Sequence, residues 1–167
     1  MNEIENIVKR AEDLRENDRI IDAEDLVRNA LEQYEDSWQL WCQLGHILTR
    51  KQEFEEAADA FLTATELEPE EFWPWLYLGH AQRDLEDYEA AIEATENALD
   101  VEIGEKEYNL AYYNLACYHA LLGRKQEAMD YLTTALESDE SLREWAREDS
   151  DLDLLRNEPG FEFLSES

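Results

Sequence analysis

The stretch WCQLGH at residues 41–46 returns as WLYLGH at residues 75–80, and this repetition decides the fold. In both copies a tryptophan comes first, and Leu-Gly-His follows at the same offset. The two tryptophans, Trp41 and Trp75, lie 34 residues apart. Because self-similarity at a fixed period of this length is typical of repeat architectures, the sequence predicts several stacked copies of one small unit.

The match extends to both sides of these two copies. A step of 34 residues back places an anchor at Ile7, and a step of 37 residues forward places one at Tyr112, because three residues are added within VEIGEKEYNL at 101–110. Small residues recur at the same two offsets in all four units: Ala11, Gly45, Gly79 and Ala116 at the first, Ala23, Ala57, Ala91 and Ala128 at the second. Larger side chains there would push two crossing helices apart at a cost of roughly 1–3 kcal/mol. The pattern therefore predicts closely packed helix pairs.

A 34-residue unit reading W-x-x-L-G, then Ala, an aromatic residue, Ala and Pro, resembles the tetratricopeptide repeat. The resemblance implies two antiparallel helices, A and B, in each unit, and an all-α, right-handed superhelical solenoid. The chain departs from the family pattern at Ile7, which replaces the aromatic anchor, and only its second unit keeps the terminal proline, Pro69. We expect four repeats within residues 1–139, at about 4–36, 38–70, 72–104 and 109–140.

Residues 141–167 break the phase of the repeat and predict a C-terminal capping helix and tail. We expect a helix at 141–148 with Trp145 as its apolar contact, a short turn around 152–156, and then the apolar residues Phe161, Phe163 and Leu164. A cap is favoured because the last repeat of a stack must be covered. The alternative is that the tail folds into the groove or docks on a second copy of the chain.

The chain is strongly acidic, with 43 acidic against 14 basic residues and a net charge of -29. Such a surface repels phosphates and anionic lipids, so we expect neither a nucleic-acid nor a membrane partner. The acidity fits a high-salt habitat, a need for solubility, or a basic partner. The charged first residues lack the apolar region of a secretory signal, and no apolar run is long enough to span a bilayer. We therefore expect a cytoplasmic protein with Cys42 and Cys117 reduced.

In tetratricopeptide-repeat proteins the A helices line a concave groove that binds peptides, so the resemblance implies an interaction module or adaptor with a protein or peptide partner. Arg15 lies deep along the first A helix, and the offsets from the anchors predict these groove residues: Gln39, Cys42, Gln43, His46, Arg50, Trp73, Leu76, Tyr77, His80, Arg83, Tyr113, Asn114 and Cys117. The set contains no acidic residue, and aromatic groups within a charged surface are typical of binding sites. We expect Trp73, Leu76 and Tyr113 to supply apolar contacts and Arg50 and Arg83 to meet a carboxylate. The alternative is that Trp73 and Tyr113 pack beneath neighbouring helices.

Some family members bind acidic chain ends through a carboxylate clamp of Lys, Asn and Arg. Lys9, Arg83 and Asn114 are of suitable type, but Glu12 and His46 stand where the clamp favours other polar groups. The complete clamp is therefore absent, and we expect a different peptide partner.

Two other function classes remain open at this point. Cys42 and His46 share a helix face and His80 follows on the next A helix, but structural zinc needs four close ligands and adjacent helices lie about 10 Å apart. A thiol enzyme would need an orienting group that the sequence does not show. We therefore expect no catalytic residue, no metal and no cofactor. The stronger rival is a homodimer formed through the apolar ends of the stack or through the tail around 161–164.

Overall fold

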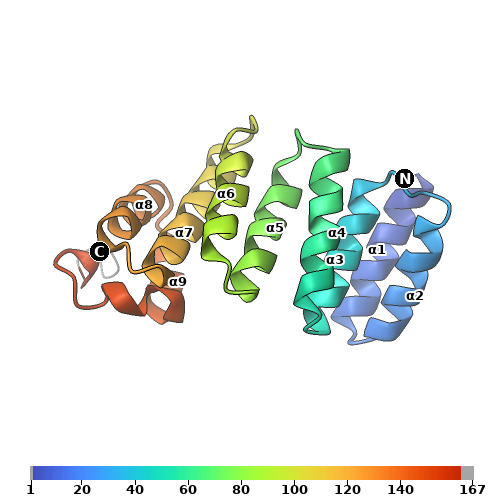
Figure 1. Cartoon of the computed structure of the whole chain (residues 1–167), viewed down its shortest axis with the longest axis horizontal. Helices are drawn as coiled ribbons and strands as arrows, with labels where there is room; N and C mark the ends of the chain where they lie inside the picture. Colours follow the sequence, from blue (N-terminus) through green and yellow to red (C-terminus); the bar gives the residue numbers. More distant parts are fainter. Residues whose placement is uncertain (1, 163–167) are drawn as a thin grey trace. The chain divides into compact units, whose positions relative to one another are not determined.

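In the computed structural model, residues 2–162 are described, apart from the side chain of residue 105. All regular elements in this part of the chain are helical (Figure 1), which confirms the all-α class. They are α1 (Glu3–Glu16), α2 (Ile20–Leu31), α3 (Trp38–Arg50), α4 (Phe54–Leu67), α5 (Phe72–Asp84), α6 (Tyr88–Leu99), α7 (Glu105–Leu121), α8 (Lys125–Ser138), α9 (Leu142–Glu148) and the 3-10 helix η1 (Ser150–Leu155). The chain divides into two compact units, unit 1 (Met1–Leu85) and unit 2 (Glu86–Ser167).

Unit 1 consists of α1 to α5, each packed against its neighbours in the chain (Figure 1, blue to green). The odd-numbered helices also contact one another, α1 with α3 and α3 with α5. These are the predicted A helices, and their contacts with one another show that they lie side by side in the unit.

A left-handed residue recurs between consecutive A and B helices. It stands at the same offset from each anchor: Asp18 (φ 59°), Gln52 (φ 63°), Glu86 (φ 60°) and Gly123 (φ 77°). This conformation ends a helix and turns the chain sharply, and glycine is the residue that adopts it most readily. The periodicity seen in the sequence is therefore also present in the backbone.

The two tryptophan anchors make the same hydrogen bond. The indole N–H of Trp41 donates to the carbonyl oxygen of Glu35 at 2.8 Å, and that of Trp75 donates to Pro69 at 2.9 Å. In both cases the acceptor precedes the tryptophan by six residues. Each bond fastens an A helix to the loop that leads into it.

The small residues are buried as predicted. Ala11, Ala23 and Ala57 are fully inaccessible, and a Cβ added to Gly45 of α3 would lie 2.6 Å from the ring of Phe61 on α4. That separation is well below an ordinary carbon–carbon contact of about 3.5–4.0 Å. Since Gly45 lies inside a helix and has no left-handed φ, the glycine is required by space alone.

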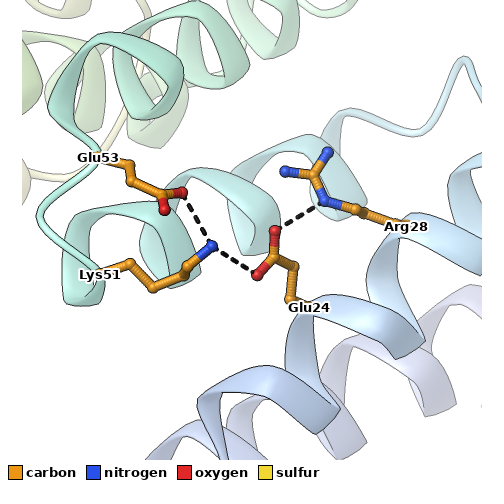
Figure 2. A network of polar contacts seen from close by, with 4 residues as sticks. All are labelled: Glu24, Arg28, Lys51 and Glu53. Atoms are coloured by element: carbon orange, nitrogen blue, oxygen red, sulfur yellow. Dashed lines mark hydrogen bonds and ion pairs between the residues drawn. The ribbon is translucent and has the colours of Figure 1, made fainter.

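An ion-pair network joins α2 to the turn between α3 and α4 (Figure 2). Lys51 Nζ lies 2.8 Å from Glu24 Oε2 and 2.9 Å from Glu53, and the guanidinium of Arg28 lies 2.8 Å from Glu24 Oε1. Glu24 is the centre of the network and is only 14% exposed. The hydrogen bond from Lys51 is the main reason that the pKa of Glu24 is lowered below its ordinary 4.5. The network links the first predicted repeat to the second.

Unit 2 begins with α6, which packs against α7, and α7 packs against α8. The anchor Tyr112 lies seven residues after the start of α7, whereas Trp41 and Trp75 lie three residues after the starts of α3 and α5. The added residues therefore lengthen α7 by about one turn at its beginning. The hydroxyl of Tyr108 fixes the preceding connection, because it donates to Val101 O at 2.8 Å and accepts from Ile103 N at 3.2 Å.

The C-terminal segment packs against α7 and α8 (Figure 1, red). Its apolar side chains join one core with Leu132 and Leu136 of α8; they are Leu142, Ala146, Leu152, Leu155 and Phe161. The helix expected at 141–148 and the turn expected around 152–156 are present as α9 and η1. The ring of Trp145 meets that of Tyr113 edge to face at 6.3 Å, as expected of an apolar contact. Trp145 is nevertheless 55% exposed, and Leu142 and Ala146 occupy the buried side of α9. Phe163 and Leu164 lie outside the described residues.

Candidate functional site

Three of the predicted groove residues in unit 1 come together as an aromatic face, which we define as His46, Trp73 and Tyr77. The rings of His46 and Tyr77 meet edge to face at 4.3 Å, and those of Tyr77 and Trp73 stack at 5.9 Å. Phe61 of α4 lies behind them, 5.2 Å from His46. All three members of the face are partly exposed. The spacing along α3 and α5 therefore builds a continuous aromatic surface from two adjacent A helices.

The structure buries three other predicted groove residues of unit 1. Cys42 is 4% exposed, Gln43 6% and Leu76 0%, because α3 packs against α1, α4 and α5. Gln43 donates from its amide nitrogen to Glu12 at 3.1 Å, which ties α3 to α1. In this structure these side chains hold neighbouring helices together and offer little or no surface to a ligand.

The remaining predicted residues of unit 1 are at least partly exposed and polar. Gln39 accepts a hydrogen bond from the Ser37 hydroxyl at 3.1 Å, and Arg83 forms an ion pair with Asp84 at 3.0 Å. His80 is exposed on α5. Arg50 lines one pocket together with His46, and His80 helps to lower the pKa of His46, so these two polar groups lie beside the aromatic face.

In unit 2 the predicted groove residues Tyr113, Asn114 and Cys117 are buried. The Tyr113 hydroxyl donates to Asp149 Oδ2 at 2.9 Å, and Cys117 Sγ lies 3.6 Å from the same oxygen. Asp149 stands between α9 and η1, so the C-terminal segment of the chain itself covers these positions. The sequence left open whether the tail caps the last repeat or folds into the groove, because the repeat pattern carries no signal that decides between them.

Cys42 and His46 are spaced like a reactive cysteine and its histidine base, but their pKa values do not suit that role. Burial raises the pKa of the Cys42 thiol to about 12, so the thiol is protonated at neutral pH, whereas a reactive cysteine is a thiolate. Burial, together with Arg15 and His80, lowers the pKa of His46 to about 3. The imidazole is therefore neutral and serves as an aromatic ring. Among the described residues, no three His, Cys, Asp or Glu side chains cluster closely enough to hold a metal ion.

A pocket of about 320 Å³ opens between α1 and α3. Its lining consists of Arg15 and Glu16 from α1 and His46, Thr49 and Arg50 from α3. Sequence reasoning placed Arg15 deep along the first A helix but left it out of the site. The signal that could have found it is its position one helical turn beyond Glu12, on the same face as the other groove positions.

No helix within residues 2–162 combines the length and the apolar character needed to cross a membrane.

Comparison with known proteins identifies the repeat independently. The family model of the tetratricopeptide repeat matches residues 8–71 and 76–142. A structure from a functional characterization of Pseudomonas aeruginosa pilF superposes with a TM-score of 0.82 at 17% identity, over 97% of this chain and 74% of that one. A crystal structure of MamA gives 0.73 at 22% identity, over 86% and 82%. The MamA RS-1 ArsTM double mutant gives 0.77 at 12% identity, over 97% and 88%. At such identities the likeness shows a shared fold, and no curated protein matches the sequence.

Proposed function

Because the chain belongs to the tetratricopeptide-repeat family, we propose that it is a protein-interaction module that holds a peptide or extended segment of a partner along the A helices of unit 1. Repeat proteins of this kind use the surface created by stacked helices to hold protein partners. The proposal assigns no catalytic residue and no cofactor. It treats residues 1–139 as four repeats, at about 4–36, 38–70, 72–104 and 109–140, and residues 141–167 as their cap.

The observation that carries the proposal is the partly exposed aromatic face of His46, Trp73 and Tyr77. Tryptophan and tyrosine are enriched among the residues that dominate binding energy, because they bury large areas with few rotatable bonds. In typical interfaces a polar rim surrounds such apolar anchors. Here Arg50, His80 and Arg83 would supply that rim. A partner segment would stack on the aromatic face and bond its polar groups to the rim.

The test compares Trp73→Ala with a matched control in capture of partners from a lysate of the source cells. Leu62→Ala is the control, because it removes an exposed apolar side chain of α4 that is outside the groove set. A hot-spot aromatic contributes roughly 2 kcal/mol, so Trp73→Ala should lower recovery of the specific partner about thirtyfold, and Leu62→Ala should leave it unchanged. Helical circular dichroism is recorded for all three proteins.

Two results would refute the proposal. Equal recovery by the wild type and Trp73→Ala would show that the aromatic face does not bind the partner. A loss of helicity in Trp73→Ala would show that this tryptophan is part of the core.

A second candidate function is self-association, and the exposed apolar residues of the C-terminal segment favour it. Trp145 is 55% exposed and Leu154 41%. Phe161, which the sequence suggested for this role, is 4% exposed and belongs to the core. If a dimer forms through this surface, light scattering on the full chain should give twice the monomer mass, and Leu154→Ser should return it to one. A monomeric wild type at high concentration removes this candidate.

A further inference from the structure

The pocket between α1 and α3 concentrates positive charge in a chain that has little of it. Two of the 14 basic residues of the chain, Arg15 and Arg50, line this one pocket, against the single carboxylate of Glu16. None of the residues of carboxylate-clamp type, Lys9, Arg83 and Asn114, belongs to its lining. The pocket is therefore a separate feature that needs its own explanation.

Arg15 is partly buried, yet within residues 2–162 its side chain makes no hydrogen bond and no ion pair. Removing a guanidinium from water is costly unless a counter-charge compensates for the lost hydration. This burial lowers the pKa of Arg15, and Glu12 opposes the shift. The group nevertheless stays charged, because an arginine does not lose its proton under physiological conditions. A charged fork of donors is thus held at the pocket wall with no acceptor in the described chain.

The other lining groups define what such an acceptor would meet. Arg50 pairs with Asp18 at 3.3 Å, but both side chains are exposed, and such a pair is weak enough to be exchanged for another. The Thr49 hydroxyl already donates to Gly45 O at 2.9 Å, so it has no proton to offer. Recognition of an anion therefore falls to the two guanidinium groups.

One wall of the pocket is a flat ring. His46 is neutral at pH 7 and lies edge to face with Tyr77 of the aromatic face. The charge of Arg15 opposes the rise that burial causes in the pKa of the Tyr77 hydroxyl, so the two groups interact electrostatically. An anion between the arginines would thus lie beside a surface on which an apolar or aromatic side chain can stack.

We propose that this pocket binds a carboxylate of the partner segment, held by Arg15 and Arg50, with the side chain next to that carboxylate resting against His46 and Tyr77. A carboxylate matches the geometry of a guanidinium fork, which can donate two parallel hydrogen bonds to it. The inference rests on the proposed function, since it names the chemistry of one end of the bound segment. The carboxylate can come from a chain end or from an Asp or Glu side chain.

The test uses small probes on the full chain labelled with ¹⁵N, observed through the arginine Nε–H signals. N-acetylphenylalanine carries a terminal carboxylate, N-acetylphenylalaninamide lacks it, and N-acetylglutamate α-amide carries only a side-chain carboxylate. We expect saturable shifts of the Arg15 signal with a carboxylate probe and at least fivefold weaker binding of the uncharged amide. Comparison of the two carboxylate probes identifies the source.

Three variants assign the binding to the pocket. Arg15→Gln should weaken the carboxylate probe at least fivefold, and Arg15→Lys should weaken it less because the charge remains but the fork is lost. Arg10→Gln removes the same charge from an exposed position of α1 outside the lining, and it should change nothing. If Arg15→Gln does not fold, the affinities of N-acetylphenylalanine and N-acetylphenylalaninamide for the wild type still show whether the pocket selects a carboxylate.

Three results would overturn the inference: equal binding of acid and amide, unchanged binding in Arg15→Gln, or equally tight binding of inorganic phosphate, which would indicate an unselective anion site. The outcome is distinct from that of the capture experiment. Capture that depends on Trp73 while both acid probes fail to bind refutes the pocket alone. Binding of a probe at Arg15 without any effect of Trp73→Ala refutes the proposed function alone.

Discussion

Adding one methyl group at Gly45 should test the close crossing of α3 and α4 in unit 1. In Gly45→Ala the new Cβ would lie 2.6 Å from two ring carbons of Phe61, about 1 Å inside an ordinary contact. Overpacking of this kind costs roughly 1–3 kcal/mol. Replacing a glycine within a helix by alanine returns about 1 kcal/mol. The expected net loss is therefore about 1 kcal/mol, or roughly 2–4 °C in the melting temperature.

The other repeats show when an alanine at this offset should stabilise the protein instead of destabilising it. At the offsets of Gly45 and Phe61, the first unit has Ala11 with Val27 and the fourth has Ala116 with Leu132, all fully buried. An alanine is thus accommodated where the facing residue is smaller than phenylalanine. In a Phe61→Leu background, Gly45→Ala should therefore stabilise the protein, by an amount approaching the helix-propensity gain of about 1 kcal/mol.

The assay is a double-mutant cycle measured by urea unfolding of the wild type, both single variants and the double variant. We expect a favourable coupling of about 1–2 kcal/mol between the two substitutions, within the range found for residues in contact. Purely additive effects of Gly45→Ala and Phe61→Leu would contradict the reasoning, because they would show that the ring of Phe61 does not limit the space at Gly45.

Three further predictions follow from single contacts. Cys42 should react with an iodoacetamide probe only after denaturant unfolds the protein, since burial raises the thiol pKa to about 12; rapid labelling of the native chain would contradict this. Glu24→Gln should lower the free energy of unfolding at pH 7 by about 1 kcal/mol, measured with urea. Because the pKa of Glu24 is lowered in the folded state, this difference from the wild type should vanish as the pH falls through that pKa, below 4.5. A difference that persists in acid would disprove the ion-pair account of Lys51 and Glu24. Tyr113→Phe should cost about 1.5–3 kcal/mol, the range for a hydrogen bond to a charged group, because it removes the bond to Asp149; an unchanged urea midpoint would show that the bond adds nothing.

The repeat itself was predictable because it depends on local sequence. The anchors Trp41 and Trp75 and the small residues of the crossing helices are specified by contacts that every copy repeats, so one period reveals them. The left-handed turn residues follow the same period, but Asp18, Gln52 and Glu86 have no common side chain, and only their offset marks them.

The candidate site was predictable only in part, because exposure depends on how neighbouring helices cover one another. The offsets placed His46 and Tyr77 on one surface, and their rings are in contact. They also placed Cys42 and Leu76 there, which the packing of α3 and α5 buries. Positions one residue apart on a helix differ by only 100° of rotation, so a small change of crossing angle moves a side chain from surface to interior. The contact of Asp149 with the fourth repeat lies beyond any periodic argument.

The anchor bonds of Trp41 and Trp75 have a consequence for how such a chain can change over time. Both indoles donate to a main-chain carbonyl, and every amino acid provides that acceptor. The acceptors are in fact as different as Glu35 and Pro69. The loops before these two A helices can therefore vary in side chain without loss of the bond that fastens each helix to its loop.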